Sequence, residues 1–342
     1  MTLCDLSTNG LFACQHGNRN VEHVMWNIFK TKSSEGTTFC LPYFFIAGFP
    51  KCGTSSLDAA LIKHPQIAAP RSKEPHWWTR IPLDTSNYNY LKLSVLRYLI
   101  HFLFKVSEGQ PKIAYDGSQS TLWDSNFFVH HQDYCAMPAV LSRVLPKAKF
   151  IVVMRNPITR LYSQYMYSCT LTYGKATLGW PKQMQKDAAT NFHTKVLVDI
   201  KYFNRCLQNR SLYECANENR FRGYRCGGVG FRITVSLYYV HLSKWMQFYP
   251  REQFLFLRME DMSANPHSLM TKITEFLGVA PVSPIQAKQW LSRRVNVQKA
   301  TSKGFTGFRM RNETRKLLEE FYRPYNAMLA ELTGDSRFKW ED

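Results

Sequence analysis

Short apolar runs alternate with segments of helical periodicity along most of the chain. An unbroken apolar run is typical of a buried strand, whereas apolar positions spaced three and four residues apart are typical of a helix. The runs predict strands at 43–48, 67–69, 112–116, 149–154 and 253–258. The helical spacing predicts helices at 57–64, 91–106, 137–144, 158–167, 235–248, 266–277 and 312–332. This alternation predicts an α/β fold in which helices flank a central, mostly parallel sheet.

The alternation indicates one domain with an extension before it and an insertion within it. Residues 1–38 show no sustained period, so we expect an N-terminal extension there. Residues 39–342 contain no internal repeat and no low-complexity linker, which predicts a single domain. Within that domain, residues 170–228 are rich in polar residues, glycine and cysteine, so we expect a loop-rich insertion.

The strand at 43–48 leads into the clearest candidate chemistry, Phe49-Pro50-Lys51-Cys52-Gly53-Thr54-Ser55-Ser56. A loop between a strand and a helix N-terminus binds anions, because the first helical amides lack intrahelical partners and the helix dipole favours negative charge. Gly53 permits a close approach of the backbone to a ligand, residues 54–56 add hydroxyl donors, and Lys51 adds a positive charge. The stretch therefore predicts an anion-binding loop.

This loop differs from the nucleotide-binding P-loop, G-x-x-x-x-G-K-[ST]. Gly48 and Gly53 have the P-loop separation, but Thr54 occupies the position of the lysine, and Lys51 lies inside the loop instead. The missing lysine argues against an ATPase, a GTPase or a nucleotide kinase. A glycine-containing turn that binds no ligand is the alternative interpretation.

A second candidate anion contact follows the strand at 149–154. Arg155 comes directly after this strand, and a guanidinium binds a phosphate through two parallel hydrogen bonds. Ser163 lies eight residues further on, in the predicted helix, where its hydroxyl can reach the same anion. Lys51, Glu74 and Arg155 all follow apolar runs, as expected for ligand contacts at the carboxyl ends of parallel strands. The alternative for Arg155 is a structural salt bridge.

The net charge limits the choice of partner. The chain has 44 Lys+Arg against 25 Asp+Glu, a formal net charge of +19. This balance suits a polyanion: a nucleic acid, an acidic glycan or an anionic membrane. Zinc-finger spacing, an RNA-recognition signature and a long basic run are missing, which argues against a nucleic acid. A generally basic surface without a dedicated partner is the alternative. No Cys-x-x-Cys pair occurs and the histidines are scattered, so we expect no metal site.

The cysteines and sequons favour an oxidising compartment. Cys206, Cys215 and Cys226 lie close together, and two of them can form a disulfide there. N-x-[ST] sequons at Asn209 and Asn312 also favour the secretory pathway, because they are acceptors for N-glycosylation. No signal peptide or transmembrane span is visible, so we expect that the anchor of a luminal protein is missing from this chain.

Four ordered motifs resemble sulfotransferases that use 3′-phosphoadenosine 5′-phosphosulfate. The loop at 49–56 resembles their 5′-phosphosulfate motif, and Arg155-Asn156-Pro157 with Ser163 resembles their 3′-phosphate motif. Lys73-Glu74-Pro75-His76-Trp77-Trp78 resembles a loop of glycosaminoglycan sulfotransferases. Thr301-Ser302-Lys303-Gly304 and the last helix resemble the cofactor-covering segment of heparan sulfate sulfotransferases. The resemblance covers most of the chain and implies the sulfotransferase fold, with a P-loop-like central sheet.

The resemblance implies a role for each matched residue. The residues implied to bind the donor are Lys51, Cys52, Gly53, Thr54, Ser55, Ser56, Arg155, Ser163, Thr301, Ser302, Lys303 and Gly304. In catalysis, Glu74 is implied to be the base, Lys51 the cation at the bridging oxygen, and His76 a second proton carrier or an acceptor contact. The residues implied to bind the acceptor are Lys73, Trp77 and Arg80. We expect a partly closed site to raise the pKa of Glu74. For His76, the alternative is packing in the core against Trp77 and Trp78.

The acceptor and the compartment also come from the resemblance. The loop at 72–80 and the insertion around Cys215 resemble family members that sulfate the 6-hydroxyl of N-acetylgalactosamine 4-sulfate. This implies chondroitin or dermatan sulfate as acceptor and the Golgi lumen as the location of a membrane-anchored glycoprotein. A heparan sulfate O- or N-sulfotransferase is the first alternative. A non-catalytic polyanion-binding protein with the same fold is the alternative of another class.

Overall fold

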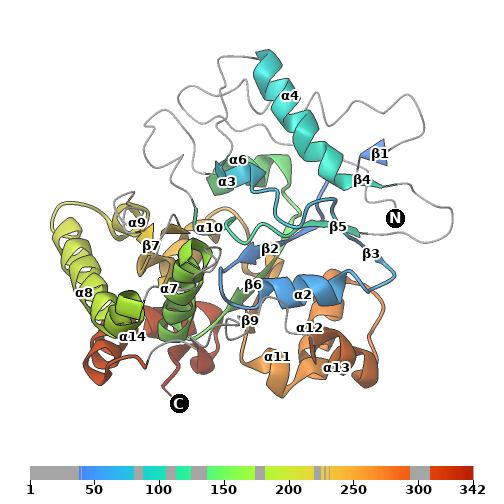
Figure 1. Cartoon of the computed structure of the whole chain (residues 1–342). Helices are drawn as coiled ribbons and strands as arrows, with labels where there is room; N and C mark the ends of the chain where they lie inside the picture. The colour runs from blue at the N-terminus through green and yellow to red at the C-terminus, as the bar shows by residue number, and fades with distance from the viewer. Residues whose placement is uncertain are drawn as a thin grey trace. The chain divides into compact units, whose positions relative to one another are not determined.

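The computed structural model describes most of the chain, and its residues divide into two compact units (Figure 1). The described residues are 38–39, 41–80, 88–104, 113–124, 137–173, 182–218, 225–226, 229–230, 232–292 and 309–341. The first unit, here called the sheet unit, comprises Met1–Phe49, Gly53–Val153 and Trp245–Val295. The second, here called the helical unit, comprises Pro50–Cys52, Met154–Lys244 and Asn296–Asp342.

The sheet unit is built on a five-stranded sheet with the strand order β3-β5-β2-β6-β9. The strands are β2 (Phe44–Gly48), β3 (Ile67–Ala68), β5 (Ile113–Asp116), β6 (Lys149–Met154) and β9 (Phe254–Arg258). β2 runs parallel to both β5 and β6, and β3 runs parallel to β5. The predicted α/β fold with a mostly parallel central sheet is confirmed. Each of the strands ends within one residue of its predicted bounds.

Aromatic side chains hold three neighbouring strands together. The ring of Phe45 on β2 stacks on that of Phe150 on β6 with centroids 5.5 Å apart, and Phe150 stacks on Phe254 of β9 at 5.1 Å. Trp245 and Tyr249 pack edge-on against Phe150, at 5.2 and 4.7 Å. Such ring pairs contribute about 0.5–1.5 kcal/mol each beyond the burial of their area. The apolar residues that predicted these strands therefore also pack the neighbouring strands against one another.

Helices follow the strands of the sheet unit along the chain. They are α2 (Thr54–Leu61), α3 (Trp77–Arg80), α4 (Tyr88–Leu99), α6 (Met137–Val144), α11 (Asp261–Ala264), α12 (Pro266–Leu277) and α13 (Pro284–Ser292). α13 packs against both α2 and α12, so these three helices lie side by side (Figure 1). α6 and α12 have the predicted bounds.

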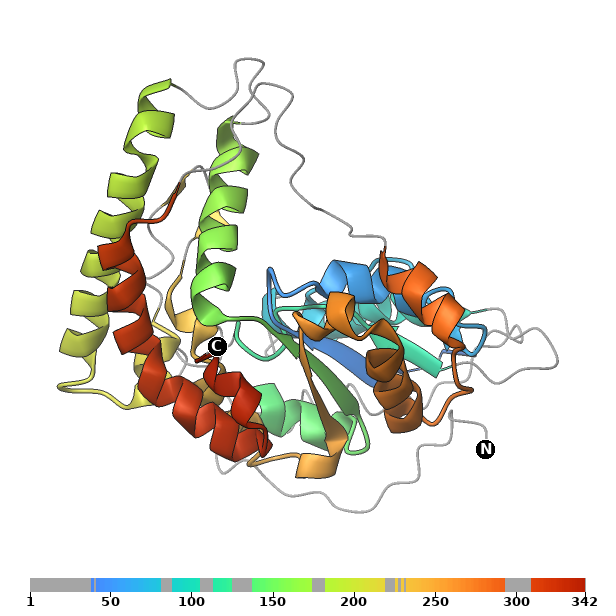
Figure 2. The ribbon, with the colours of Figure 1, turned by 90° about the horizontal axis from the view of Figure 1, so that it is seen from below.

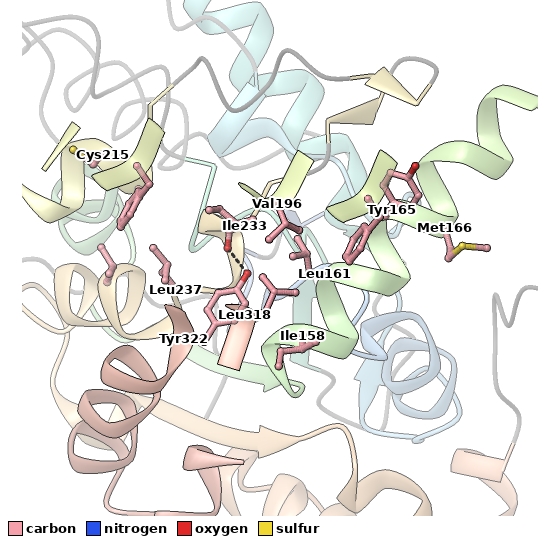
Figure 3. Close-up of a cluster of buried hydrophobic side chains, with 14 of the residues drawn as sticks. Ile158, Leu161, Tyr165, Met166, Val196, Cys215, Ile233, Leu237, Leu318 and Tyr322 are labelled. Carbon is pink, nitrogen blue, oxygen red and sulfur yellow. Dashed lines mark hydrogen bonds between the residues drawn. The ribbon is translucent and has the colours of Figure 1, made fainter. Parts of the chain in front are cut away.

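The helical unit contains the longest helices of the described chain. They are α7 (Pro157–Tyr173), α8 (Lys182–Cys206) and α14 (Asn312–Thr333), with the shorter α9 (Leu212–Ala216) and α10 (Tyr238–Trp245). Figure 2 shows α14 beside α7 and α8, with which it is in contact. α14 buries positions spaced four residues apart, among them Leu318 and Tyr322, because this spacing places side chains on one helix face. In Figure 3 these two side chains lie among apolar residues of the unit, and the Tyr322 hydroxyl donates to the carbonyl oxygen of Ile233 at 2.9 Å.

Two predictions about secondary structure are wrong. The expected loop-rich insertion at 170–228 contains α8, a helix of 25 residues, and α9. α8 has many polar residues because only one face is buried, with Phe192, Val196 and Phe203 in the core of the unit. The helix expected at 91–106 ends earlier: α4 stops at Leu99, and a 3₁₀ turn (Ile100–Phe102) leads into β4 (Leu103–Phe104), which pairs with β1 (Thr38–Phe39).

The helical unit also contains the predicted disulfide. Cys206 at the end of α8 is bonded to Cys215 of α9, with the Cα atoms 5.8 Å apart. The sequon residues Asn209 and Asn312 are both exposed. No helix in the described part of the chain is long and apolar enough to cross a membrane. Most of the predicted N-terminal extension lies outside the described residues, as does the segment 301–304.

Candidate active site

The predicted anion-binding loop connects β2 to α2. α2 begins at Thr54, directly after Gly53, which has a left-handed backbone with φ of +85°. Glycine is favoured at position 53, because any other residue would be strained with this backbone conformation. Its Cβ would also lie 3.1 Å from the sulfur of Met262. Ser55 and Ser56 are half-buried in the first turn of the helix. The strand, loop and helix N-terminus expected from the sequence are confirmed, and they form the arrangement that binds anions.

Lys51 has an unusual backbone and an unusual electrostatic environment. Its φ of +66° is left-handed, a conformation that non-glycine residues adopt rarely and that is concentrated at functional sites. Burial lowers the pKa of its ammonium, the nearby guanidinium groups of Arg155 and Arg160 act in the same direction, and together they bring this pKa to about 8. An anion placed beside Lys51 would relieve both effects.

Arg155 and three residues of α7 follow one another at intervals of four residues. The Arg155 Nε donates to the Thr159 Oγ1 at 3.0 Å, and its Nη1 donates to the carbonyl oxygen of Lys51 at 3.4 Å. Ser163 lies one turn beyond Thr159 on the same helix face, and is half-buried. One turn further, the ring of Tyr167 lies under Lys51, with 3.9 Å from the Lys51 Nζ to the ring centroid. Lys51, Arg155 and Ser163 are thus brought to one side of α7.

Arg160 on α7 is a structural arginine that is held in place by hydrogen bonds. The Arg160 guanidinium is fully buried and donates to Ser236, to the Gln164 Oε1 at 2.6 Å and to the carbonyl oxygen of Arg232 at 3.0 Å. For Arg155, no carboxylate within the described residues forms an ion pair.

Glu74 lies in the sheet unit between two basic side chains. Its Oε1 accepts a hydrogen bond from the Lys73 Nζ at 2.6 Å, and its Oε2 lies 3.2 Å from the His76 Nε2. The Lys73 ammonium also donates to the Ser55 Oγ at 2.8 Å. The structure thus joins the predicted base, through Lys73, to a hydroxyl of the anion-binding loop.

The expectation that the pKa of Glu74 is raised is wrong. Burial does push this pKa upward, but the hydrogen bond from His76 and the charge and hydrogen bond of Lys73 together outweigh it and bring the pKa to about 2. The two basic neighbours of Glu74 within the same motif, Lys73 and His76, together have a larger effect than the partly closed site. Glu74 is therefore a carboxylate at neutral pH, but a weak base in this arrangement.

A polar segment after β5 holds His76 in place. The His76 Nδ1 lies 2.7 Å from the Ser120 Oγ, and the backbone N–H of His76 donates to the Ser118 Oγ at 2.9 Å. The backbone of His76 is left-handed, with φ of +52°. A Cβ on Gly117 would lie 2.6 Å from the carbonyl oxygen of Lys73, so only glycine permits the loop to lie this close. These contacts argue against the packed core histidine considered as the alternative.

Sequence reasoning missed Ser118 and Ser120. Both follow β5 directly, and ligands of parallel sheets bind at the carboxyl ends of strands. The rule that singled out Lys51 and Arg155 therefore applies to these serines as well. Their small, common side chains carried no motif that would have distinguished them from an ordinary turn.

The structure corrects the prediction that Trp77 binds the acceptor. Trp77 is 1% exposed, stacks on Tyr98 with ring centroids 4.9 Å apart, and donates from its Nε1 to the backbone of Ser94 at 3.0 Å. It belongs to the core. Arg80 has an exposed side chain, with its Nε 3.4 Å from the Asp124 Oδ2, and its role toward an acceptor stays a prediction.

Other predicted contacts are not tested by the structure. The predicted donor contacts Thr301, Ser302, Lys303 and Gly304 lie outside the described residues. Within the residues that are described, no group of three or more His, Cys, Asp or Glu side chains is placed to hold a metal ion. Cys52 is buried, with its sulfur 3.7 Å from the Tyr238 hydroxyl.

Known proteins with similar sequences carry the same domain. The family model of the sulfotransferase domain matches residues 41–316. Carbohydrate sulfotransferase 15 of Homo sapiens is 31% identical over 332 residues, which cover 88% of this chain and 55% of the relative. The bifunctional heparan sulfate N-deacetylase/N-sulfotransferase 2 of Homo sapiens is 26% identical, over 88% of this chain and 30% of the relative. The chain thus spans about half the length, or less, of these curated relatives.

A solved structure shares the fold. The sulfotransferase of Alicyclobacillus acidocaldarius superposes with a TM-score of 0.54 at 22% identity, covering 88% of this chain and 99% of the other. The resemblance seen in the four motifs is therefore confirmed over most of the sequence. The chain belongs to the sulfotransferase domain family.

Proposed function

We infer that this chain transfers a sulfuryl group from 3′-phosphoadenosine 5′-phosphosulfate to a hydroxyl of a glycosaminoglycan. The donor supplies the sulfuryl group, and the reaction moves this group from a phosphate oxygen to a sugar oxygen. The protein must then hold the donor's phosphates, neutralise charge on the leaving oxygen and accept the proton of the attacking hydroxyl.

One observation carries this proposal: the Lys73 ammonium joins the Ser55 hydroxyl to the Glu74 carboxylate, at 2.8 and 2.6 Å. Ser55 belongs to the anion-binding loop, and Glu74 is a carboxylate whose second oxygen lies near His76. A nucleotide-binding loop alone would support many activities. A carboxylate linked to that loop through Lys73 supports group transfer to a hydroxyl.

The residues divide the work. Lys51 neutralises the negative charge that develops on the bridging oxygen of the donor, an interaction that strengthens in the transition state. Arg155 and Ser163 bind the 3′-phosphate, and Ser55 and Ser56 bind the 5′-phosphosulfate with the amides at the start of α2. Glu74 takes the proton of the acceptor hydroxyl, while His76 orients the carboxylate. In the segment 301–304, Lys303 and its neighbours complete the donor site.

The acceptor we propose is the 6-hydroxyl of N-acetylgalactosamine 4-sulfate in chondroitin or dermatan sulfate. The net charge of +19 and the similarity to carbohydrate sulfotransferase 15 support a polyanionic sugar. Lys73 and Arg80 are candidates for contacts with it. We propose that the protein acts in the Golgi lumen. The disulfide of Cys206 and Cys215 supports an oxidising compartment.

Incubation with ³⁵S-labelled donor and either chondroitin 4-sulfate or heparan sulfate tests the activity, and disaccharide analysis of the product identifies the hydroxyl. Label at the 6-position of 4-sulfated N-acetylgalactosamine is expected. Label only in heparan sulfate would favour the alternative acceptor, which the similarity to the heparan sulfate enzyme supports. A folded protein that labels no glycan but binds heparin would instead support a non-catalytic polyanion-binding role.

A further inference from the structure

Lys73 is the only side chain in the described part of the chain seen to contact both Glu74 and a hydroxyl of the anion-binding loop. An ammonium has three N–H donors, so it can make both hydrogen bonds at once. Both partners lie within the sheet unit, as does Lys73 itself. An anion in the loop would therefore lie beside the same ammonium that is bonded to Glu74.

We propose that Lys73 is a positioning residue that makes the basicity of Glu74 depend on occupation of the anion-binding loop. Without donor, the ammonium bridges Ser55 and Glu74. When the 5′-phosphosulfate occupies the loop, the ammonium turns toward it and leaves Glu74, which then becomes the stronger base. This proposal rests on the proposed function and assigns Lys73 a role toward the donor in addition to its proposed contact with the acceptor.

Only the side chain of Lys73 has to move for this exchange. The backbone of residues 73–76 is fixed, because the carbonyl oxygen of Lys73 lies against Gly117 and the N–H of His76 is bonded to Ser118. The lysine side chain has a flexible four-carbon stem and a compact charge, so it can change partner while its backbone stays in place.

Glu74 keeps its position after Lys73 leaves. Its Oε2 lies 3.2 Å from the His76 Nε2, and His76 is held by Ser120 through its other ring nitrogen at 2.7 Å. The carboxylate therefore loses a positive neighbour without losing its orientation. In the donor-free state, Lys73 and His76 bring the pKa of Glu74 to about 2. Removing an adjacent opposite charge raises a carboxyl pKa by about 1 to 3 pH units.

A bound phosphosulfate competes successfully for Lys73. It carries more negative charge than one carboxylate and presents several acceptor oxygens, and charge-assisted hydrogen bonds to such groups are among the strongest in proteins. Ser55, the present partner of Lys73, belongs to the loop in which the anion would bind. The exchange therefore needs a small displacement of the ammonium rather than a rearrangement of the loop.

Other titratable groups near this bridge are already paired. Asp58 on α2 accepts a hydrogen bond from the Tyr115 hydroxyl at 2.6 Å, and burial raises its pKa. Asp116 at the end of β5 accepts from the Tyr98 hydroxyl at 2.9 Å, and burial raises its pKa as well. These two carboxyl groups are held by neutral phenols, so Glu74 is the group whose titration depends most directly on Lys73.

The test measures the titration of Glu74 by ¹³C NMR of side-chain carboxyl groups, with and without adenosine 3′,5′-bisphosphate. In the wild type, saturating bisphosphate should raise the pKa of Glu74 by about 1 to 3 pH units. In Lys73→Met, that pKa should be raised already without ligand, and bisphosphate should change it little. Lys73→Arg keeps a positive charge, and Lys63→Met removes an exposed lysine of the same unit as a control for net charge.

The outcomes separate this proposal from the proposed function. Bisphosphate that binds the wild type, as measured by calorimetry, without changing the Glu74 titration would overturn the coupling and leave the proposed function intact. Failure of the folded wild type to bind bisphosphate would count against the proposed function and against the coupling with it. Thermal unfolding monitored by circular dichroism establishes that each variant is folded. If Lys73→Met does not fold, Lys73→Arg decides, because it should retain a ligand-dependent titration.

Discussion

Glu74 and Lys51 both have a lowered pKa, and the two shifts have opposite meanings. For Glu74, the lowered pKa means that its surroundings favour the charged form, because His76 and Lys73 are bonded to the carboxylate. For Lys51, it means that its surroundings penalise the charged form, because the ammonium is partly buried near two arginines. The Glu74 carboxylate has two basic partners, whereas the charged groups that lower the pKa of Lys51 are themselves positive. Lys51 is therefore prepared for the donor, and Glu74 needs a change in its surroundings before it can act.

Replacing the base should have the largest effect. In Glu74→Gln, transfer of ³⁵S to chondroitin sulfate should fall by about 10²–10⁴-fold, because the amide cannot accept the hydroxyl proton. Binding of adenosine 3′,5′-bisphosphate should be retained or strengthened, since Lys73 loses its carboxylate partner. Calorimetry provides that control. Transfer at the wild-type rate in Glu74→Gln would remove Glu74 from the mechanism.

Replacing Lys51 should have the next largest effect on transfer. In Lys51→Met, kcat should fall by about 10²–10³-fold, as for the loss of one group that stabilises charge in a transition state. Unlike Glu74→Gln, this variant should also bind bisphosphate more weakly. It should at the same time be more stable near neutral pH, because the folded protein no longer holds a partly buried ammonium. Thermal unfolding compares the stability of Lys51→Met and Glu74→Gln with that of the wild type. A Lys51→Met protein less stable than the wild type would contradict the prediction.

The sequence predicted the parts of the site that depend on backbone order. The strands, the loop of Lys51 and the position of Arg155 before α7 follow from apolar runs and turn residues, which act locally. The same reasoning could not predict the state of Glu74. Its pKa depends on where Lys73 and His76 point, and the left-handed backbone of His76 is fixed by contacts with a distant segment.

The errors in the prediction have the same origin. Trp77 was assigned to the acceptor from the resemblance, but its ring is buried and stacks on Tyr98 of α4, a contact that no local sequence pattern reveals. The segment of α8 was expected to be loops because most of its residues are polar and its apolar stripe is narrow. Phe192, Val196 and Phe203 form this stripe and are buried in the core with residues of α7 and α14. In both cases, tertiary packing decides what propensity leaves open.

The pH dependence of the two groups should differ in a defined way. Between pH 2 and 4.5 the unfolded protein carries a proton on Glu74 that the folded protein lacks, so stability is lost as the pH falls through this window. Between pH 8 and 10.5 the unfolded protein likewise carries the extra proton on Lys51, so stability rises with pH there. The slope at high pH should be missing in Lys51→Met, and the slope at low pH should be weaker in Glu74→Gln. Urea unfolding at a series of pH values measures both.

The reactivity of Lys51 reports its state directly. The rate of its acetylation by acetic anhydride, followed by peptide mass spectrometry, should have a midpoint near pH 8 in the donor-free protein. From pH 7 to pH 9 the neutral fraction, and hence the rate, should increase about tenfold. Bisphosphate should suppress this reaction and leave the exposed Lys63 unaffected. Equal protection of both lysines would show that the ligand does not bind at Lys51.

The smallest expected effect concerns the ring beneath Lys51. The ammonium of Lys51 lies 3.9 Å from the ring centroid of Tyr167, and a cation over an aromatic face is stabilised by about 0.5–1 kcal/mol. Removing the ring in Tyr167→Leu should therefore lower the pKa of Lys51 further and raise its acetylation rate at pH 7 by about two- to fourfold. Tyr167→Phe keeps the aromatic face and should behave as the wild type. A rate that changes equally in Phe and Leu variants would point to the hydroxyl instead. An unchanged rate in both variants would mean that burial and the two arginines alone set the pKa of Lys51, without a contribution from the Tyr167 ring.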